Sequence, residues 1–102
     1  MEVDPDEVAP LATKQSVDET LTERGNRYGK FKDHAELSQQ LTSVMRCSDG
    51  LERLEPDMRE AMEMIQHKIA RILNGDPTYA DSWHDIAGYA KLVDDRLGGV
   101  ER

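Results

Sequence analysis

Two long stretches of this chain repeat their apolar side chains every three or four residues, which constrains the fold more than any other feature. An α-helix turns by about 100° per residue, so this spacing gathers those side chains on one face. The predicted core faces in residues 56–74 and 77–97 are Met58, Ala61, Met62, Ile65, Ile69, Ile72 and Leu73, and Tyr79, Trp83, Ile86, Ala90, Val93 and Leu97. No stretch of the sequence alternates with the period of two that β-strands require. We therefore predict an all-α fold.

Signals for helix ends divide the chain into a bundle of about four helices. Ser16 and Glu19 have the spacing of a capping box, and Gly25 marks the predicted end of the first helix. A second helix is expected over residues 32–46, and Pro56 suits the first turn of a third. The fourth follows an Asp-Pro dipeptide and ends before a pair of glycines.

The composition favours one small domain whose core is incomplete in a single copy. Of the 102 residues, 33% are charged and 37% hydrophobic, which leaves little apolar surface for an isolated core. Residues 1–14 are acidic, contain two prolines and show no periodicity, so we predict a disordered tail followed by a single helical domain over residues 15–102. Small helical chains of this kind often oligomerise, and a dimer or larger homo-oligomer is expected.

Charge and hydropathy exclude several classes of partner. A net charge of −8 argues against binding to a nucleic acid polymer, since such binding rests on many basic contacts with phosphate. No apolar run is long enough to span a bilayer, so no membrane association is expected. Cys47 is the sole cysteine, which rules out an internal disulfide and favours a reducing compartment, the cytoplasm.

Two groups of acidic residues are candidates for a metal site. Glu60 and Glu63 lie one turn apart on the third predicted helix, and hard cations prefer carboxylate oxygens on a rigid support. Asp81 and Asp85 on the fourth helix share a stripe with a mid-helix glycine, Gly88, which suits close approach of a ligand or a backbone. The alternatives are a solvated face for the glutamates and structural salt bridges for the aspartates.

The connection between the first two helices concentrates positive charge in an acidic protein. Its bases are Arg24, Arg27, Lys30 and Lys32, interleaved with two glycines and the aromatic residues Tyr28 and Phe31. Bases of this kind can meet phosphate and a ring can stack on a nucleobase, although the Walker pattern is absent. The alternative is a plain turn whose bases neutralise nearby acids. His34 faces the apolar side of the second helix, as a core residue or as a ligand.

The stretches "ERGNRYGKFKDHAE", "REAMEMIQHKIARILNGDP" and "YADSWHDIAGYAKLVDD" together resemble a family of small, functionally uncharacterised proteins encoded by phages and prophages. The likeness extends from about Glu23 to Arg96 and implies a phage origin, with the host cytoplasm as the place of action. It implies no particular activity.

More distantly, the helical layout resembles the MazG-like all-α nucleoside triphosphate pyrophosphohydrolases, which are dimers or tetramers. Their two acid pairs hold magnesium around nucleotide phosphates. Glu60 and Glu63 match the first pair and Asp85 matches the last acid of the second, whereas Ser82 replaces a glutamate and Asp81 lies one residue earlier. The resemblance implies catalysis by Glu60, Glu63 and Asp85, with Mg²⁺ held by Glu60, Glu63, Asp81 and Asp85.

Two functional hypotheses follow. The first is a magnesium-dependent nucleotide pyrophosphohydrolase. The second is a phage protein without turnover that sequesters a nucleotide signal or binds a host defence protein, a role that tolerates the serine at position 82. A nucleotide or another phosphate compound would be bound by Arg24, Arg27, Tyr28, Lys30, His34, Lys68, Arg71, Trp83 and Tyr89. An HD-type phosphohydrolase is rejected, because His34 faces inward while His67 and His84 point away from their core faces.

Overall fold

The computed structural model describes residues 16–102, so the predicted tail over residues 1–14 lies outside the described residues. The described part contains four α-helices and one 3₁₀-helix, and no strand: α2 (Val17–Tyr28), α3 (Phe31–Arg46), η1 (Asp49–Arg53), α4 (Pro56–Asn74) and α5 (Ala80–Leu97). The all-α fold is thereby confirmed. Within residues 16–102, none of the helices is sufficiently long and apolar to cross a membrane.

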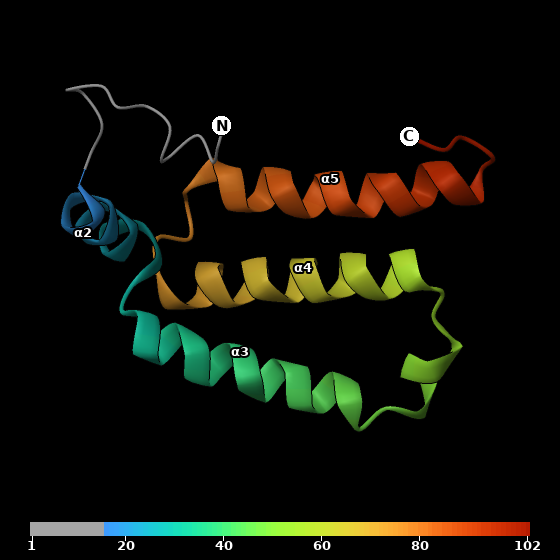
Figure 1. Ribbon diagram of the computed structural model, residues 1–102, viewed down its shortest axis with the longest axis horizontal. Helices are drawn as coiled ribbons and strands as arrows, with labels where there is room; N and C mark the ends of the chain where they lie inside the picture. Colours follow the sequence, from blue (N-terminus) through green and yellow to red (C-terminus); the bar gives the residue numbers. More distant parts are fainter. Residues whose placement is uncertain (1–15) are drawn as a thin grey trace.

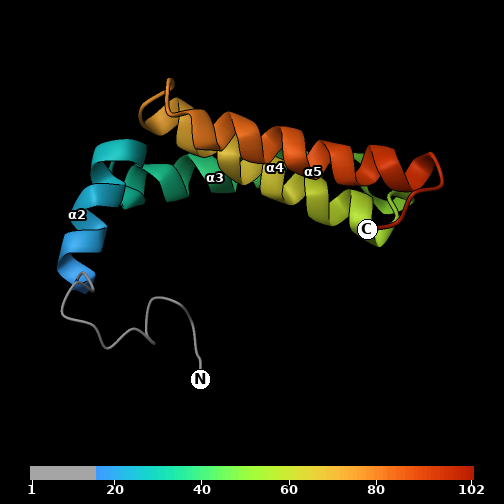
Figure 2. The same ribbon diagram turned by 90° about the horizontal axis from the view of Figure 1, so that it is seen from above.

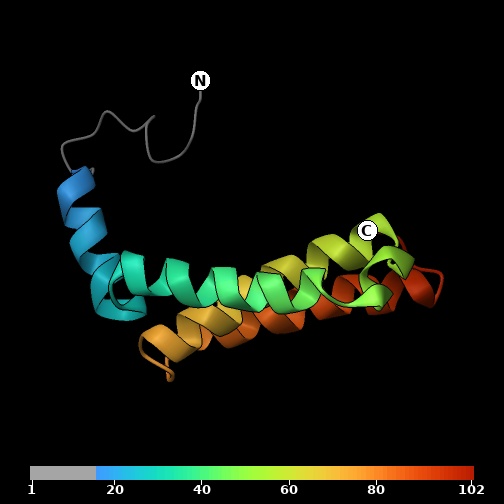
Figure 3. The same ribbon diagram turned by 90° about the horizontal axis from the view of Figure 1, so that it is seen from below.

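Helices α3, α4 and α5 form one layer, with α4 in the middle and its two neighbours antiparallel to it (Figure 1). The two views from above and below show this layer along its edge, with α2 projecting from one side of it (Figures 2 and 3). A single layer of three helices has two broad faces. Helix α2 covers only one end of one of them.

The ends of α2 and α4 meet in the tightest backbone contact of the fold. Helix α2 begins at the predicted capping box of Ser16 and Glu19 but runs past Gly25 to Tyr28, and Gly29 ends it with a φ of +80°. The side-chain amide of Asn74 donates to the carbonyl oxygens of Tyr28, at 2.8 Å, and Lys30, at 3.1 Å. A Cβ atom on Gly29 would lie 2.2 Å from the Asn74 carbonyl oxygen. The loop glycine thus allows two backbones to approach each other.

Helix α4 buries two opposite sides, which differs from the single core face that we predicted. Gln66 donates to the Ser38 carbonyl of α3 at 2.6 Å, and Ala61 and Ala70 are the buried hydrophobic residues of the described part. The predicted core residues that are exposed instead are Met62, Ile69, Leu73, Trp83, Ala90 and Leu97. The prediction that they lie in the core of one chain was wrong, because a helix between two antiparallel neighbours packs along its flanks.

Alanine at position 29 should destabilise the fold. The residue would need a left-handed backbone and would collide with the Asn74 carbonyl, so we expect the free energy of unfolding to fall by about 3 kcal/mol. Gly99 is the matched control, since its φ is +96° but a Cβ atom there would have no neighbour within 4 Å. Gly99→Ala should cost only about 1 kcal/mol. Equal losses in urea unfolding of the two variants would contradict this account of the contact.

Candidate functional site

A cavity of about 540 Å³ opens where α2, the turn after it, α3 and α4 meet. Its volume lies within the range of small-molecule sites. Its lining is contributed by all four of these segments: Leu21, Arg24, Gly25, Tyr28, Gly29, Lys30, Phe31, His34, His67 and Arg71. Five of the predicted ligand-binding residues are brought together here, namely Arg24, Tyr28, Lys30, His34 and Arg71.

The lining of this cavity carries positive charge and aromatic surface. Arg24, Lys30 and Arg71 contribute three cations, and none of the described residues that line it is an acid. The Arg71 guanidinium lies over the Tyr28 ring, with its carbon 4.1 Å from the ring centroid. That contact holds both side chains in place by a cation–π attraction. In a chain of net charge −8, such a cavity is a local attractor for anions.

Two histidines form the floor of the cavity. The rings of His34 and His67 meet edge to face with their centroids 4.8 Å apart. His34 is only 6% exposed, as the sequence predicted for its inward position, and its Nδ1 atom has no hydrogen-bond partner in the described structure. A buried polar atom without a partner costs free energy, and this one is covered by protein atoms and has almost no surface open to the cavity.

Both imidazoles are held in the neutral form. Desolvation by burial lowers the pKa of His67 to about 4, with further lowering from the charge of Arg71, from His34 whenever it is protonated, and from the charge of Lys68. Burial followed by the charge of Arg71 also lowers the pKa of His34. A neutral imidazole offers one donor and one acceptor nitrogen. The floor can therefore bind polar groups while Arg24, Lys30 and Arg71 supply the charge.

Arg27, another of the predicted bases between the first two helices, turns away from the cavity. It donates to the Tyr79 hydroxyl at 2.9 Å, and its guanidinium carbon lies 4.7 Å from the centre of that ring. The Tyr79 hydroxyl in turn donates to Asp81 at 2.8 Å. Arg27 and Asp81 are thus the two ends of one chain of contacts that joins α2 to the start of α5.

The predicted acidic residues are distributed along α4 and α5. Glu60 and Glu63 are exposed on α4, and Glu63 lies 3.5 Å from Arg59. Asp85 forms an ion pair with Lys68 at 3.1 Å, where the Lys68 side chain is 12% exposed. This contact fits the structural alternative for Asp85, a salt bridge between two packed helices, and it occupies a lysine that we predicted as a phosphate ligand.

The two predicted acid pairs lie at different heights along the axes of the antiparallel helices α4 and α5. Asp85 lies beside Lys68 along these axes, because the two side chains form an ion pair. Glu63 lies five residues before Lys68, a displacement of about 7.5 Å at 1.5 Å per residue. Within residues 16–102, no three His, Cys, Asp or Glu side chains are grouped so that they could hold a metal ion. The magnesium site stays a prediction, and one chain alone does not assemble it.

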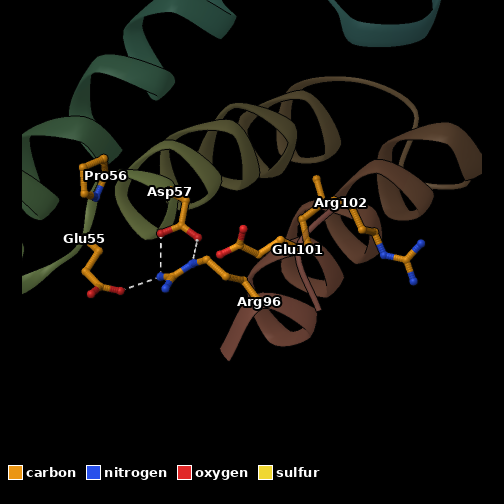
Figure 4. A pocket seen from close by; sticks show the side chains of 7 residues that line it. Glu55, Pro56, Asp57, Arg96, Glu101 and Arg102 are labelled. Carbon is orange, nitrogen blue, oxygen red and sulfur yellow. Dashed lines mark hydrogen bonds and ion pairs between the residues drawn. The ribbon is translucent and has the colours of Figure 1, made fainter. Parts of the chain in front are cut away.

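A second, open hollow of about 670 Å³ lies at the far end of the hairpin and is lined by ion-paired side chains (Figure 4). There Arg96 donates to both carboxylate oxygens of Asp57 and also to Glu55. These hydrogen bonds raise the pKa of Arg96 and lower that of Asp57. Because the guanidinium already has its partners, this cluster ties the end of α5 to the start of α4 and offers little to a ligand.

Trp83, Tyr89 and Gly88 lie away from the cavity. Trp83 is 55% exposed and donates from its indole nitrogen to the Pro77 carbonyl at 2.8 Å, whereas Tyr89 is half-buried on α5. A Cβ on Gly88 would find open space, so nothing in the described chain requires a glycine there. Trp83 and Tyr89 were predicted to bind the ligand, but neither they nor Gly88 line the cavity.

The sequence profile of one family matches residues 14–96, which include every residue that lines the cavity and all four predicted metal ligands. The chain belongs to the family described as a domain of unknown function, DUF6378. No curated protein and no solved structure matches it. The DUF6378 match therefore extends over the site but assigns no chemistry to it.

His67 is a lining residue that the sequence placed on the side of its helix opposite the apolar residues. Its place on the face opposite the apolar residues of α4 suggested exposure, yet α3 packs on part of that face and covers the ring. A signal was present in the sequence, because His67 and Arg71 are one turn apart and Arg71 was already a candidate.

The low pKa of His67 predicts a specific pH dependence of stability. The unfolded chain takes up a proton at this side chain near pH 6.5 and the folded chain only near pH 4, so the free energy of unfolding should fall as pH falls between these values. His67→Gln should flatten the decline between about pH 7 and about pH 5 by on the order of 1 kcal/mol in urea titrations. The exposed His84 is the control. If His84→Gln flattened the decline equally, the assignment to His67 would be wrong.

Proposed function

We propose that this protein binds a nucleotide or a related phosphate compound in the cavity between α2, α3 and α4. The observation that carries the proposal is the composition of the lining: three cations, two neutral imidazoles, two aromatic rings and no acid. Arginine and lysine bind phosphate oxygens, and the exposed Phe31 ring at the cavity offers a surface for stacking on a base.

Sequestration of the ligand without turnover is the version that the geometry favours. None of the described residues that line the cavity carries a carboxylate that could bind a metal or activate water, and Asp85 is paired with Lys68. A phage origin, which the resemblance of the three sequence stretches implies, would suit such a role in a host cytoplasm, with a host protein as the other class of partner. This origin remains a prediction.

MazG-like hydrolysis with Mg²⁺ is the second candidate, and one observation favours it. Glu60 is exposed, and helical rotation places it on the same side of α4 as His67 and Arg71, which line the cavity. A metal held by Glu60 and Glu63 would need further ligands, and a second copy of the chain could supply them.

A binding panel tests the first proposal. Nucleotides and inorganic pyrophosphate, each with and without Mg²⁺, should raise the melting temperature of the protein, and the ligand should be recovered intact. Arg24→Gln should weaken the binding about tenfold, equivalent to about 1.4 kcal/mol, because one charged contact is lost. Arg59→Gln is the matched control, since Arg59 lies on α4 beside Glu63 and outside the cavity. No shift with any compound, or equal weakening in the two variants, would contradict the proposal.

The same panel separates the two candidates. If hydrolysis occurs, product should appear only with Mg²⁺, and Glu60→Gln should abolish it without lowering the melting temperature, because the Glu60 side chain is exposed. Chromatography of the nucleotides after incubation measures this. Product formation that persists in Glu60→Gln would exclude the predicted role of Glu60.

A further inference from the structure

The face of the α3–α4–α5 layer opposite to α2 is apolar. On α4, Gln66 contacts α3 and Lys68 contacts α5. Helical geometry places Met62, Ile69 and Leu73 between these two directions, so that these exposed side chains point out of the layer. Because α3 and α5 both run antiparallel to α4, the same helical geometry brings further exposed residues to that side. They are Val44 on α3 and Trp83, Ala87, Ala90 and Leu97 on α5.

This apolar face is large for a chain of this size. Its six large side chains range in exposure from 39% for Ile69 to 71% for Val44. At roughly 150–250 Å² for each large side chain, these fractions amount to on the order of 600 Å² of apolar surface. Patches of that size on soluble proteins mark interaction sites, and about 800 Å² per partner is typical of a stable interface.

The interior of the single chain contains correspondingly few large apolar side chains. The buried hydrophobic residues of the described part are two alanines, Ala61 and Ala70, and no large side chain there is fully buried. A domain gains most of its stability from burial of large apolar side chains. Covering the apolar face would therefore bury most of the large apolar side chains that one chain leaves exposed.

We propose that this face is the interface with a second copy of the same chain. Another copy is the one partner that is present at matching concentration wherever the protein is made. Two layers joined face to face by a two-fold axis would bury both sets of side chains. Asp94, which is exposed between Ala90 and Leu97, would belong to the hydrated rim.

The proposed interface leaves the cavity open. His67 and Arg71 line the cavity from the opposite side of α4, and α2 projects from that side of the layer (Figure 2). Dimer formation and ligand binding would therefore use different surfaces, and the dimer does not depend on the proposed function being correct.

Light scattering and fluorescence test the dimer on the full-length chain. The wild-type protein should have twice the 11.6 kDa mass of one chain, and its single tryptophan, Trp83, should emit at short wavelength because it is covered. Leu73→Glu, at a side chain 64% exposed in one chain, should yield a helical monomer with emission shifted to the red. Leu92→Glu is the matched control, because Leu92 is similarly exposed but lies on another side of α5 and should remain dimeric.

Three results would overturn the proposal. One is a wild-type protein that is a monomer at tens of micromolar and whose tryptophan emission is red-shifted. This result would not depend on whether any variant folds. The second is a dimer that survives Leu73→Glu unchanged. The third is a dimer that Leu92→Glu disrupts as strongly as Leu73→Glu does, which would place the contact elsewhere.

Discussion

The contact between the turn after α2 and the C-terminal end of α4 determines the rest of the site. Two glycines, Gly29 and Gly75, allow the backbones to touch, and Asn74 binds the carbonyl groups on either side of Gly29. The Asp76 amide adds a hydrogen bond to the Arg27 carbonyl at 2.7 Å. Without this junction, α2 would have little to hold it to the layer, and the cavity beneath it would lose one wall.

The junction also separates the bases of the α2–α3 connection into two groups. Arg27 turns towards Tyr79 and Asp81 and helps to fix α5, whereas Arg24 and Lys30 remain at the cavity with Arg71. Within residues 16–102, the cations that line this cavity form no ion pair with an acid, and like charges that lie close together repel one another. An anionic ligand would relieve that repulsion. This is the physical reason for assigning phosphate binding to this end of the molecule.

Periodicity and caps were sufficient to predict the helices, since both depend on local sequence. The boundaries at Pro56 and Asn74 and the capping box of α2 were as expected. The predicted core faces of α4 and α5 were wrong for a single copy of the chain. The sequence does not say on which sides of a helix its neighbours lie. Asp85 was a candidate ligand because it shares one side of its helix with Asp81 and Gly88. Its ion pair with Lys68 could not be predicted, because it depends on the packing of α4 against α5.

The basic residues between the first two helices were more informative about the site than the acid pairs. Positive charge concentrated in one segment of an acidic chain indicates a specific role for that segment. Its two glycines have different roles. Gly29 accommodates α4 instead of a ligand, while Gly25, inside α2, has open space around it and lines the cavity. The contact between His67 and His34 depends on tertiary structure, because the two residues lie 33 positions apart in the sequence.

The central claim is that anions enter this cavity, and an amide NMR titration with inorganic pyrophosphate tests it most directly. The amide signals of Gly25 and Gly29, which line the cavity, should shift and saturate, as should that of His67. Gly50 and Gly98, which lie outside the cavity, should remain unchanged in the same spectra. No saturable shift at Gly25, Gly29 and His67, or shifts of equal size at all five residues, would contradict the claim.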